Sequence, residues 1–342
     1  MDLRSDTVTE PTTAMREAMA TAEVGDDVYA EDPTIARLEA RGAELLGQEA
    51  ALFCVSGSMA NLLGVWLCAE RGTEILCDEL AHIVRAEMGA HGAVHGITTR
   101  TWSSPGGVAR LEDIESLVSF EGGHLVKTSA IEVENTMNFA GGAIQPLDNL
   151  RQISQFCHNH GLNLHLDGAR LGNACVANST SLADYGSLAT TVTFCLSKGL
   201  GAPVGSLLAS TSDNIARARV ERKRLGGGWR QAGILAAAGL YALDHNIARL
   251  ADDNRAAAAL TDEVRRVAPW AVPDDVPTNI VVIQTGTMSA DIIMDKAGKQ
   301  GLQLTKLGPH LIRAVTHLDV SFAECVEAGR IIATILSEAE PS

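Results

Sequence analysis

The sequence predicts an α/β protein built around a parallel sheet. Short apolar runs typical of buried strands alternate with longer amphipathic or alanine-rich runs typical of helices along the 342 residues, which is the pattern of βαβ units. With 46% hydrophobic and 20% charged residues, the composition is that of a globular protein. Because a chain of this length exceeds what one hydrophobic core usually sustains, we expect two domains.

The predicted elements of the first part of the chain follow this alternation. Asp32 and Pro33 supply an N-cap and a first-turn proline for a helix that closes near Gly47. Apolar and β-branched runs predict strands, and the runs between them predict helices. The strands are expected at 50–55, 74–78, 96–102, 125–134, 162–167, 191–196 and 204–210, and further helices at 59–67, 213–224 and 231–245.

The rest of the chain indicates a smaller unit. Residues 246–267 are rich in alanine and charged side chains and predict a long amphipathic connector helix. A βαβ-like unit follows, with its expected elements at 279–284, 289–300 and 311–316 and a closing helix from Ser321. We therefore expect an N-terminal segment and a large domain over residues 1–245, and the connector helix and a small C-terminal domain over residues 246–342.

Charge and cysteine content narrow the class of protein. The formal net charge of −15 argues against nucleic acid and anionic membranes as partners. No stretch approaches the ~20 consecutive apolar residues that span a bilayer, and the polar residues after Met1 indicate no secretory signal. Seven cysteines without the spacing of a disulfide framework indicate free thiols in a reducing compartment. We expect a cytoplasmic protein.

A lysine follows one of the predicted buried strands. Residues 191–196 lead into Ser197, Lys198 and Gly199 and then into a loop rich in glycine and proline. Lysine is almost never fully buried unless it is paired or used in chemistry. One such use is a Schiff base, in which the amine attacks a carbonyl. The alternative is a loop lysine whose stem packs while its ammonium reaches water.

An aspartate ends another predicted strand. Residues 162–166 alternate apolar with other residues and lead to Asp167. Ligands of α/β sheets lie outside the carboxyl ends of the strands, where both Asp167 and Lys198 are expected. Pyridoxal phosphate needs this pair, because the lysine holds its carbonyl carbon and the carboxylate keeps its pyridine nitrogen protonated. The alternative for an aspartate before glycine is a turn or helix cap.

A third motif has the form of a phosphate cradle. Ser56, Gly57 and Ser58 stand between the strand at 50–55 and the helical run at 59–67. This geometry aims backbone N–H groups and the positive end of a helix at an anion, although the same residues also make an ordinary N-cap. Together with Asp167 and Lys198 they predict a cofactor site.

Several histidines stand near one another without the spacing of a metal site. Cys157, His158 and His160 fit neither paired helical histidines nor a zinc ribbon, and the two histidines are expected at a helix C-terminus. His91 and His95 are four apart, but the glycines around them weaken any helix there. We expect no metal site.

The ordered set of motifs resembles the low-specificity L-threonine aldolases, which are fold-type I pyridoxal-phosphate enzymes of the beta-eliminating lyase and threonine aldolase group. Single motifs are modestly specific, whereas the ordered set is highly specific and spans nearly the whole chain. The resemblance implies an aspartate-aminotransferase-like fold, with a mostly parallel seven-stranded sheet in the large domain and a smaller C-terminal α/β domain. The matching segments are 2–9, 25–29, His82, His124, 134–136, 165–170, the lysine segment, 226–231 and 313–319.

The resemblance also implies a reaction. The expected activity is reversible retro-aldol cleavage of L-threonine, L-allo-threonine and related L-β-hydroxy-α-amino acids, including phenylserine types, to glycine and an aldehyde. Lys198 would carry pyridoxal 5′-phosphate as a Schiff base. Arg170 is expected to contact either the O3′ atom of the cofactor or the substrate carboxylate.

Four further side chains are expected to handle the substrate. Arg313, helped by Ser5, is the expected carboxylate clamp, because the planar fork of arginine fits a carboxylate better than lysine does; a structural surface arginine is the alternative. Cleavage also needs a base for the β-hydroxyl proton, and His82 and His124 are the candidates, since histidine titrates nearest neutrality. Either histidine could instead belong to the core. By resemblance, His82 stacks on the pyridine face.

Two residues are expected to act between subunits. The resemblance implies that Tyr29 and Arg230 reach the site of a neighbouring subunit, Tyr29 toward the substrate and Arg230 toward the cofactor. A homodimer is then the minimum active unit, and a tetramer is the expected assembly.

The sequence departs from the family pattern at two places near the substrate side chain. Met137 stands where many relatives carry a histidine, and residues 83–86 lack the common aromatics after His82. The hypothesis that follows is a roomier pocket for bulky or aromatic aldehydes. The alternatives to an aldolase are another fold-type I enzyme, such as an aminotransferase or a β-eliminating lyase, and a non-catalytic protein that has kept the fold.

Overall fold

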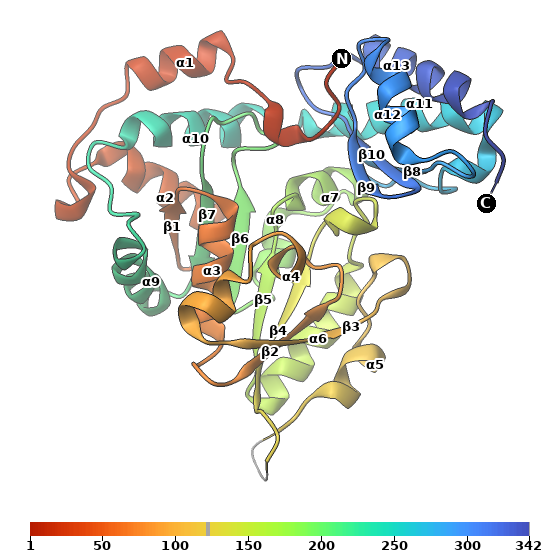
Figure 1. The fold of residues 1–342 in the computed structure, drawn as a ribbon. Coiled ribbons are helices and arrows are strands. Elements are labelled where there is room, and N and C mark those ends of the chain that lie inside the picture. Colours follow the sequence, from red (N-terminus) through yellow and green to blue (C-terminus); the bar gives the residue numbers. More distant parts are fainter. Residues whose placement is uncertain (121–123, 342) are drawn as a thin grey trace.

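A mostly parallel sheet forms the centre of the larger part of the molecule (Figure 1). The computed structural model describes residues 1–120 and 124–341. Within these residues the strand order is β1-β7-β6-β5-β4-β2-β3, with parallel neighbours from β6 to β3 and β7 antiparallel to both β6 and β1. The predicted seven-stranded α/β sheet is confirmed. Its strands are β1 (Ala50–Cys54), β2 (Glu74–Asp78), β3 (Thr98–Trp102), β4 (Thr128–Glu134), β5 (Asn163–Asp167), β6 (Thr191–Cys195) and β7 (Ser206–Ser210).

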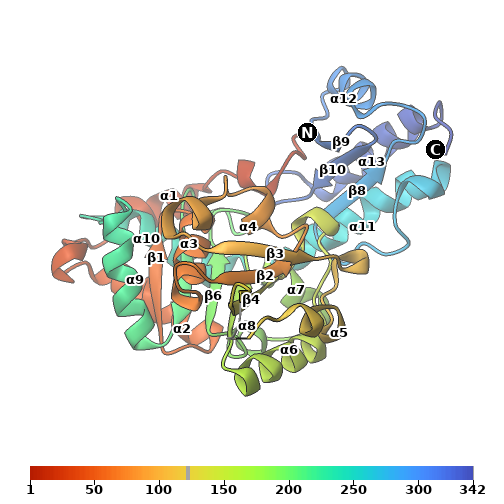
Figure 2. The same ribbon diagram turned by 60° about the horizontal axis from the view of Figure 1, so that its bottom comes forward.

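Helices cover both faces of this sheet (Figures 1 and 2). Strand residues alternate between the two faces, so Leu52 belongs to the same hydrophobic cluster as Leu63 of α3, while Phe53 belongs to the larger cluster that includes Leu38 of α2. In the described ranges no helix is long and apolar enough to cross a membrane. The helices of this part are α1 (Thr13–Ala20), α2 (Pro33–Leu46), α3 (Gly57–Cys68), α4 (His82–Arg85), α5 (Leu111–Ile114), α6 (Leu147–His160), α7 (Leu171–Asn178), α8 (Leu182–Gly186), α9 (Ser212–Arg224) and α10 (Gly233–His245).

The ends of helix α2 follow the capping signals of the sequence. The Asp32 carboxylate accepts the backbone N–H groups of Thr34 and Ile35, and Pro33 occupies the first turn. Gly47 ends the helix with φ of 65°, in the left-handed region that favours glycine. By contrast, His91–His95 forms one short π-helical turn, which the glycines of the sequence did not predict.

The C-terminal unit is a small sheet with helices on one face (blue in Figure 1). Long helix α11 (Leu250–Val267) packs against α13 (Phe322–Leu336), and α12 (Ala290–Gly298) lies beside α13. Strand β10 (Leu311–Val315) pairs antiparallel with β8 (Ile280–Gln284) on one side and with β9 (Thr305–Gly308) on the other. The βαβ unit therefore runs from β8 through α12 to β9, and the sequence missed β9 because this short strand contains no apolar alternation.

The first residues of the chain belong to the C-terminal unit. Leu3 is fully buried in the same hydrophobic cluster as Leu260 and Ile312. Its backbone N–H donates to the Gln303 carbonyl, and its own carbonyl accepts from Val315. The start of the N-terminal segment that we expect before the large domain therefore packs with the C-terminal unit, where the Leu3 side chain is buried in the hydrophobic cluster. The chain then crosses from this unit to the edge of the large sheet.

Candidate active site

The carboxyl ends of β1, β5 and β6 bring the three predicted cofactor motifs to one edge of the large sheet. Asp167 is the last residue of β5, and Lys198 follows the neighbouring strand β6 by three residues. Strand β1 runs in the same direction as β6, because both pair antiparallel with β7 between them. Ser56, two residues after β1, therefore lies at the same edge as Lys198.

Lys198 lies in a loop that is held by backbone hydrogen bonds. The Lys198 carbonyl accepts from the Gly201 N–H at 2.8 Å and from the Thr9 hydroxyl at 2.9 Å. The loop closes where the Leu196 N–H donates to the Gly205 carbonyl. Lys198 is half-buried, so the fold fixes its backbone and leaves its amine accessible at the edge of the sheet.

Asp167 is a buried carboxylate that stays ionised. Its Oδ2 accepts from the Asn61 side-chain amide at 2.7 Å, and its Oδ1 accepts from the Ala169 N–H at 3.0 Å. Burial alone raises the pKa of Asp167, but the charges of His82 and Lys198 and the Asn61 hydrogen bond outweigh burial and hold the pKa below its ordinary value. An ionised carboxylate is what a protonated pyridine nitrogen requires.

The turn before α3 has the geometry of an anion cradle. The Ser56 hydroxyl caps the helix by accepting the Met59 N–H, while Ser58 is exposed on the first turn. A Cβ added at Gly57 would stand 2.9 Å from the Cys195 sulfur, so only glycine lets the turn approach the end of β6 this closely. This close approach sets free backbone N–H groups of α3 beside the Lys198 loop. The residues present fit a phosphate-bearing cofactor.

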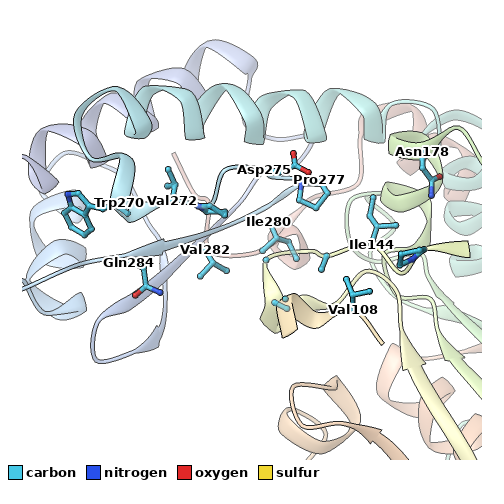
Figure 3. A pocket seen from close by; sticks show the side chains of 17 residues that line it. Val108, Ile144, Asn178, Trp270, Val272, Asp275, Pro277, Ile280, Val282 and Gln284 are labelled. Atoms are coloured by element: carbon cyan, nitrogen blue, oxygen red, sulfur yellow. The ribbon is translucent and has the colours of Figure 1, made fainter. Parts of the chain in front are cut away.

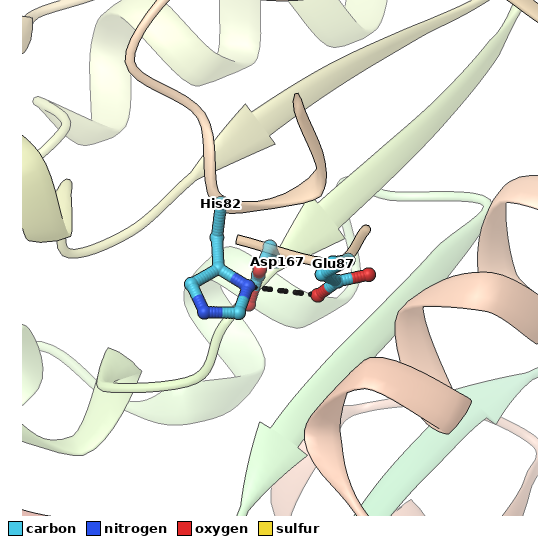
Figure 4. Close-up of side chains that lie close together, drawn as sticks. All are labelled: His82, Glu87 and Asp167. Atoms are coloured by element: carbon cyan, nitrogen blue, oxygen red, sulfur yellow. Dashed lines mark hydrogen bonds and ion pairs between the residues drawn. The ribbon is translucent and has the colours of Figure 1, made fainter. Parts of the chain in front are cut away.

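His82 lies beside Asp167 and is oriented by a second carboxylate (Figure 4). The His82 Nδ1 and the Glu87 Oε1 are 2.8 Å apart, and the same oxygen accepts from the Asn61 amide at 2.9 Å. Burial acts to lower the pKa of His82, but the Glu87 hydrogen bond and the Asp167 charge outweigh it, so the net pKa is raised. The contact fixes the imidazole through Nδ1 and leaves its Nε2 for other partners.

Arg170 forms a buried two-point ion pair with Asp6. The Arg170 Nε and Nη2 each donate to one Asp6 oxygen at 2.7 Å, and both side chains are at most 5% exposed. Burial raises the pKa of Asp6, but the Arg170 charge outweighs it and holds that pKa well below its ordinary value. Two of the three guanidinium nitrogens of Arg170 are therefore committed to Asp6. The expected contact to cofactor or substrate is limited to Nη1.

Arg313 is a buried arginine that forms no ion pair with any described residue. Its Nη1 donates to the Asn138 side-chain oxygen at 2.8 Å and its Nη2 to the Arg4 carbonyl at 3.3 Å, while its buried Nε has no partner in the described chain. Burial and the charge of Arg170 lower the pKa of Arg313 to about 10. A buried guanidinium held by neutral oxygens alone is a site for an incoming anion.

Ser5 lies on the segment that joins these two arginines. Its neighbours in the chain are Arg4, whose carbonyl accepts from Arg313, and Asp6, which pairs with Arg170. The Ser5 hydroxyl accepts from the Thr7 N–H and caps the short helix that follows. The N-terminal segment thus brings Ser5 to the clamp through its backbone.

Tyr29 and Arg230 lie together on the surface. Tyr29 is 73% exposed, and the Arg230 side chain is 65% exposed. Arg230 donates to the Asp26 carboxylate at 3.2 Å, and its carbonyl accepts from the Asp27 N–H. This pairing joins the segment of Tyr29 to the segment of Arg230, and nothing in the described chain covers either side chain.

Comparison with known proteins identifies the family. Residues 2–286 match the model of the beta-eliminating lyases, and a low specificity L-threonine aldolase of Escherichia coli (strain K12) is 39% identical over 96% of this chain and 97% of its own. This chain belongs to the beta-eliminating lyase family. Among solved structures, a Leishmania major threonine aldolase covers 98% of this chain and 99% of its own at a TM-score of 0.84 and 23% identity. An SPT with PLP covers 98% and 87% at a TM-score of 0.74 and 14% identity.

The resemblance drawn from the sequence motifs is thereby confirmed, and so is the fold type. The relative named L-threonine aldolase matches almost end to end. The two structures are too different in sequence to show more than the fold, and both share the arrangement of sheet and C-terminal unit over nearly the whole chain.

His124 does not join the site of this beta-eliminating lyase. It is exposed in a turn, four residues before β4 begins at Thr128. The site lies at the other end of β4, beyond Glu134, and seven strand residues span roughly 20 Å. The prediction of His124 as a base is therefore wrong for the site of its own subunit, because it lies at the amino end of the sheet.

The two departures from the family pattern lie beside the clamp. Met137 is buried and packs against Gly107, where an added Cβ would stand 3.1 Å from the Met137 side chain. The Arg85 guanidinium lies 5.6 Å over the ring of Phe139. Both contacts belong to the short segments that carry His82 and Asn138.

A mainly apolar cavity lies at the seam between the two units (Figure 3). It has a volume of about 880 Å³, and no predicted site residue lines it. Ala140, Gly141, Ala143 and Ile144 form one wall, and Ile280 and Val282 of β8 form another. The candidate active site is thus recognised by the chemistry of its side chains and not by the size of a cavity.

Four site residues were not singled out from the sequence. Asn61, Glu87 and Asn138 each bridge two functional side chains, and Asp6 neutralises Arg170. Only Asp6 carried a signal, because it stands inside the matching segment at 2–9.

Among the described residues, two groups of side chains have oxygens and nitrogens close enough together to hold a metal ion. Both include Asp167, together with His82 and Glu87 in one group and with Glu132 and Glu134 in the other.

Proposed function

We propose that this protein is a pyridoxal-phosphate-dependent aldolase that cleaves L-threonine, L-allo-threonine and related L-β-hydroxy-α-amino acids to glycine and an aldehyde, and that also runs in reverse. The observation that carries the proposal is the buried, unpaired guanidinium of Arg313, linked through Asn138 and Arg170 to the edge that holds Asp167 and Lys198. An amino-acid carboxylate supplies the missing counter-charge.

The cofactor is pyridoxal 5′-phosphate, which when bound supplies a carbonyl for an amine and a ring that draws electrons from the bond to be broken. Lys198 would hold it through its amine. Asp167 would keep the proton of the ring nitrogen in place, and Ser56, Gly57, Ser58 and the start of α3 would bind the phosphate. His82 would stack on the ring.

Arg313 selects and orients the amino acid. Its fork binds the α-carboxylate, with Ser5 alongside, and Arg170 adds Nη1, the one guanidinium nitrogen that is not paired with Asp6 and that contacts only the Asn138 side-chain oxygen, at 3.4 Å. Orientation decides the reaction, because the bond at Cα that stands perpendicular to the ring is the bond that breaks. A clamp built from buried, fixed side chains holds the amino acid in one orientation, and Cα–Cβ cleavage requires that this orientation place the Cα–Cβ bond perpendicular to the ring.

His82 is the base for the β-hydroxyl proton. Glu87 fixes its Nδ1, so Nε2 accepts the proton as the Cα–Cβ bond breaks. Because glycine carries one hydrogen more at Cα than the cleaved amino acid, the imidazolium can return the same proton.

Threonine and phenylserine differ only beyond Cβ, where Arg85 and Phe139 lie on the segments next to His82 and Asn138. We propose that this side accepts bulky or aromatic aldehydes.

We also propose an oligomer in which Tyr29 and Arg230 complete a neighbouring subunit's site, with a dimer as the minimum and a tetramer as the full assembly. Their exposure on one subunit supports this proposal. A cytoplasmic location is proposed because all seven cysteines are free and buried, which suits a reducing compartment. Cell fractionation and sedimentation test these two points.

Product analysis tests the reaction. The purified protein with added cofactor is incubated with L-allo-threonine, and the expected products are glycine and acetaldehyde in equal amounts. A keto acid with pyridoxamine phosphate would indicate an aminotransferase, and a keto acid with ammonia would indicate a β-eliminating lyase. Comparable catalytic efficiencies for threonine and phenylserine would contradict a pocket dedicated to bulky substrates.

A further inference from the structure

One buried carboxylate touches both halves of the candidate site. Glu134 is the last residue of β4, is 2% exposed, and lies next to Asp167 in the sheet register. Neither of its oxygens meets a cationic side chain at ion-pair distance in residues 1–120 and 124–341. Each instead accepts one backbone N–H, and the two N–H groups belong to different segments.

The first oxygen holds the segment of the base. The Glu134 Oε2 accepts the His82 N–H at 2.8 Å. Helix α4 begins at His82 and has no side-chain cap of its own, because Ala81 precedes it. Glu134 therefore acts as the missing cap from a distant strand and fixes where the His82 backbone stands above Asp167.

The second oxygen holds the segment of the clamp. The Glu134 Oε1 accepts the Asn138 N–H at 2.9 Å, and the short helix that Asn138 opens likewise has no side-chain cap. The Asn138 side-chain oxygen in turn accepts from Arg313 at 2.8 Å and from Arg170 at 3.4 Å. The position of the Asn138 backbone thus sets where the two guanidinium groups are anchored.

We propose that Glu134 is a positioning residue for the reaction, and that its single carboxylate sets the distance between the base His82 and the carboxylate clamp built on Asn138. The inference rests on the proposed function, which gives His82 and Arg313 their roles. A retro-aldol cleavage needs both ends of one amino acid held at once, the β-hydroxyl at the base and the carboxylate at the clamp. A shared acceptor makes the two ends one rigid unit.

The neighbourhood of Glu134 agrees with this role. Burial and the charge of Asp167 raise the pKa of Glu134 to about 7, while the two backbone N–H groups favour its ionised form. Placing a second buried carboxylate beside Asp167 is unfavourable for folding, so stability alone explains Glu134 poorly. Its presence is explained by the two backbone N–H groups that it accepts and by the segments that those groups belong to.

Glu132 provides a matched control on the same strand. It lies two residues before Glu134 on the same face, is fully buried, and neither of its oxygens has a hydrogen-bond partner in the described chain. Burial and the charge of Glu134 raise the pKa of Glu132 well above its ordinary value, which favours its neutral form. Glu132→Gln therefore changes an equally buried side chain without removing an acceptor of either segment.

The test compares Glu134→Gln with Glu132→Gln in the full-length holoenzyme. Glutamine offers one carbonyl oxygen, so its NH₂ group must face one of the two backbone N–H groups. We expect faster amide hydrogen exchange in residues 82–86 or 138–140, a kcat lower by about tenfold or more and a KM higher by about tenfold, since a lost charged hydrogen bond is worth at least a factor of ten. Cofactor content, read from the visible absorbance of the lysine-bound cofactor, should stay at the wild-type level.

A third variant keeps the test decisive if Glu134→Gln does not fold. Glu134→Asp retains two acceptor oxygens on a shorter arm and is expected to lose kcat and raise KM in the same sense, by less. Asn138→Ala removes only the clamp contact and should raise KM while kcat changes less than in Glu134→Gln.

The outcomes separate this inference from the proposed function. Glu134→Gln with wild-type kcat, KM and amide exchange overturns the inference, and so does a Glu132→Gln variant that loses as much, because the effect would then be general packing of β4. If the wild-type protein cleaves no β-hydroxy-α-amino acid, the proposed function fails. The exchange measurement still reports whether Glu134 holds the two segments together.

Discussion

The inner and outer halves of the candidate site are built differently. In the inner half, Asp6 and Arg170 are paired and buried, the Asp167 carboxylate accepts three hydrogen bonds, and Arg313 is held by neutral oxygens. In the outer half, the side chains of Tyr29 and Arg230 are about two thirds exposed or more. The groups of the inner half are buried and hydrogen-bonded within one chain, whereas no described residue covers the two side chains of the outer half.

This difference shows which features one subunit can organise alone. Buried, fixed donors and acceptors cost no reorganisation when charge moves in the reaction, so they belong where bonds break. An exposed tyrosine and arginine cannot be oriented in that way by water. A second subunit is the simplest means of fixing them, and the predictions below test the two halves separately.

The largest expected effect is the loss of the inner ion pair. Asp6→Asn leaves the Arg170 guanidinium buried without its counter-charge, which should lower the free energy of unfolding by about 3–5 kcal/mol. Urea denaturation followed by circular dichroism measures this change. The matched control is Asp2→Asn, which breaks the exposed pair with Arg4 on the same segment and should cost less than about 1 kcal/mol. Equal losses in the two variants would contradict a special inner pair.

The next effect concerns the substrate clamp. Arg313→Lys keeps the charge but removes the planar fork, so KM for L-allo-threonine should rise by roughly ten- to a hundredfold with a smaller change in kcat. Steady-state kinetics measures both constants. Arg330→Lys, on a surface arginine of α13 that pairs with Glu263 and Glu327, should leave both unchanged. An unaltered KM in Arg313→Lys would remove Arg313 from the clamp.

A shift of the pH profile tests the base. His82 must be unprotonated to accept a proton, so activity should fall as pH falls through the His82 pKa, which is raised above 6.5 by Glu87 and Asp167 against the effect of burial. Glu87→Gln removes the largest raising cause, so the acid limb of kcat should move to lower pH. Glu79→Gln, an exposed residue that accepts from Ser103, should leave the limb in place. A limb that stays fixed in Glu87→Gln would mean that His82 is not the titrating base.

The smallest effect on the subunit itself is expected in the outer half. Tyr29→Ala should change the free energy of unfolding of a single subunit by less than about 0.5 kcal/mol, because its side chain is exposed there. Its effect should fall on assembly, with weaker association in sedimentation velocity and lower specific activity on dilution. Sedimentation and dilution curves identical to those of the wild type would place Tyr29 outside any subunit interface.

The sequence predicted the features that are encoded in short stretches of the chain. Lys198 and Ser56 follow strands that the sequence shows as apolar runs, and Asp167 ends such a strand. The carboxyl ends of parallel strands meet at one edge of a sheet. Asp6, Asn138 and Glu87 act through partners as far as 273 residues away along the chain, and no local pattern encodes such contacts. His124 was misplaced because a motif histidine does not show to which end of the sheet its loop belongs. Strand β9 was missed because its four residues contain a single large apolar side chain, Leu307, and so show no strand pattern.

The most direct test of the account is the variant Lys198→Ala. The visible absorbance that appears when cofactor is added to the wild-type protein should be lost, and glycine and acetaldehyde should no longer form from L-allo-threonine. The unfolding transition should stay close to that of the wild type, because the Lys198 side chain is only half-buried and the loop is held through backbone atoms. A folded Lys198→Ala protein that still cleaves L-allo-threonine would contradict the central claim.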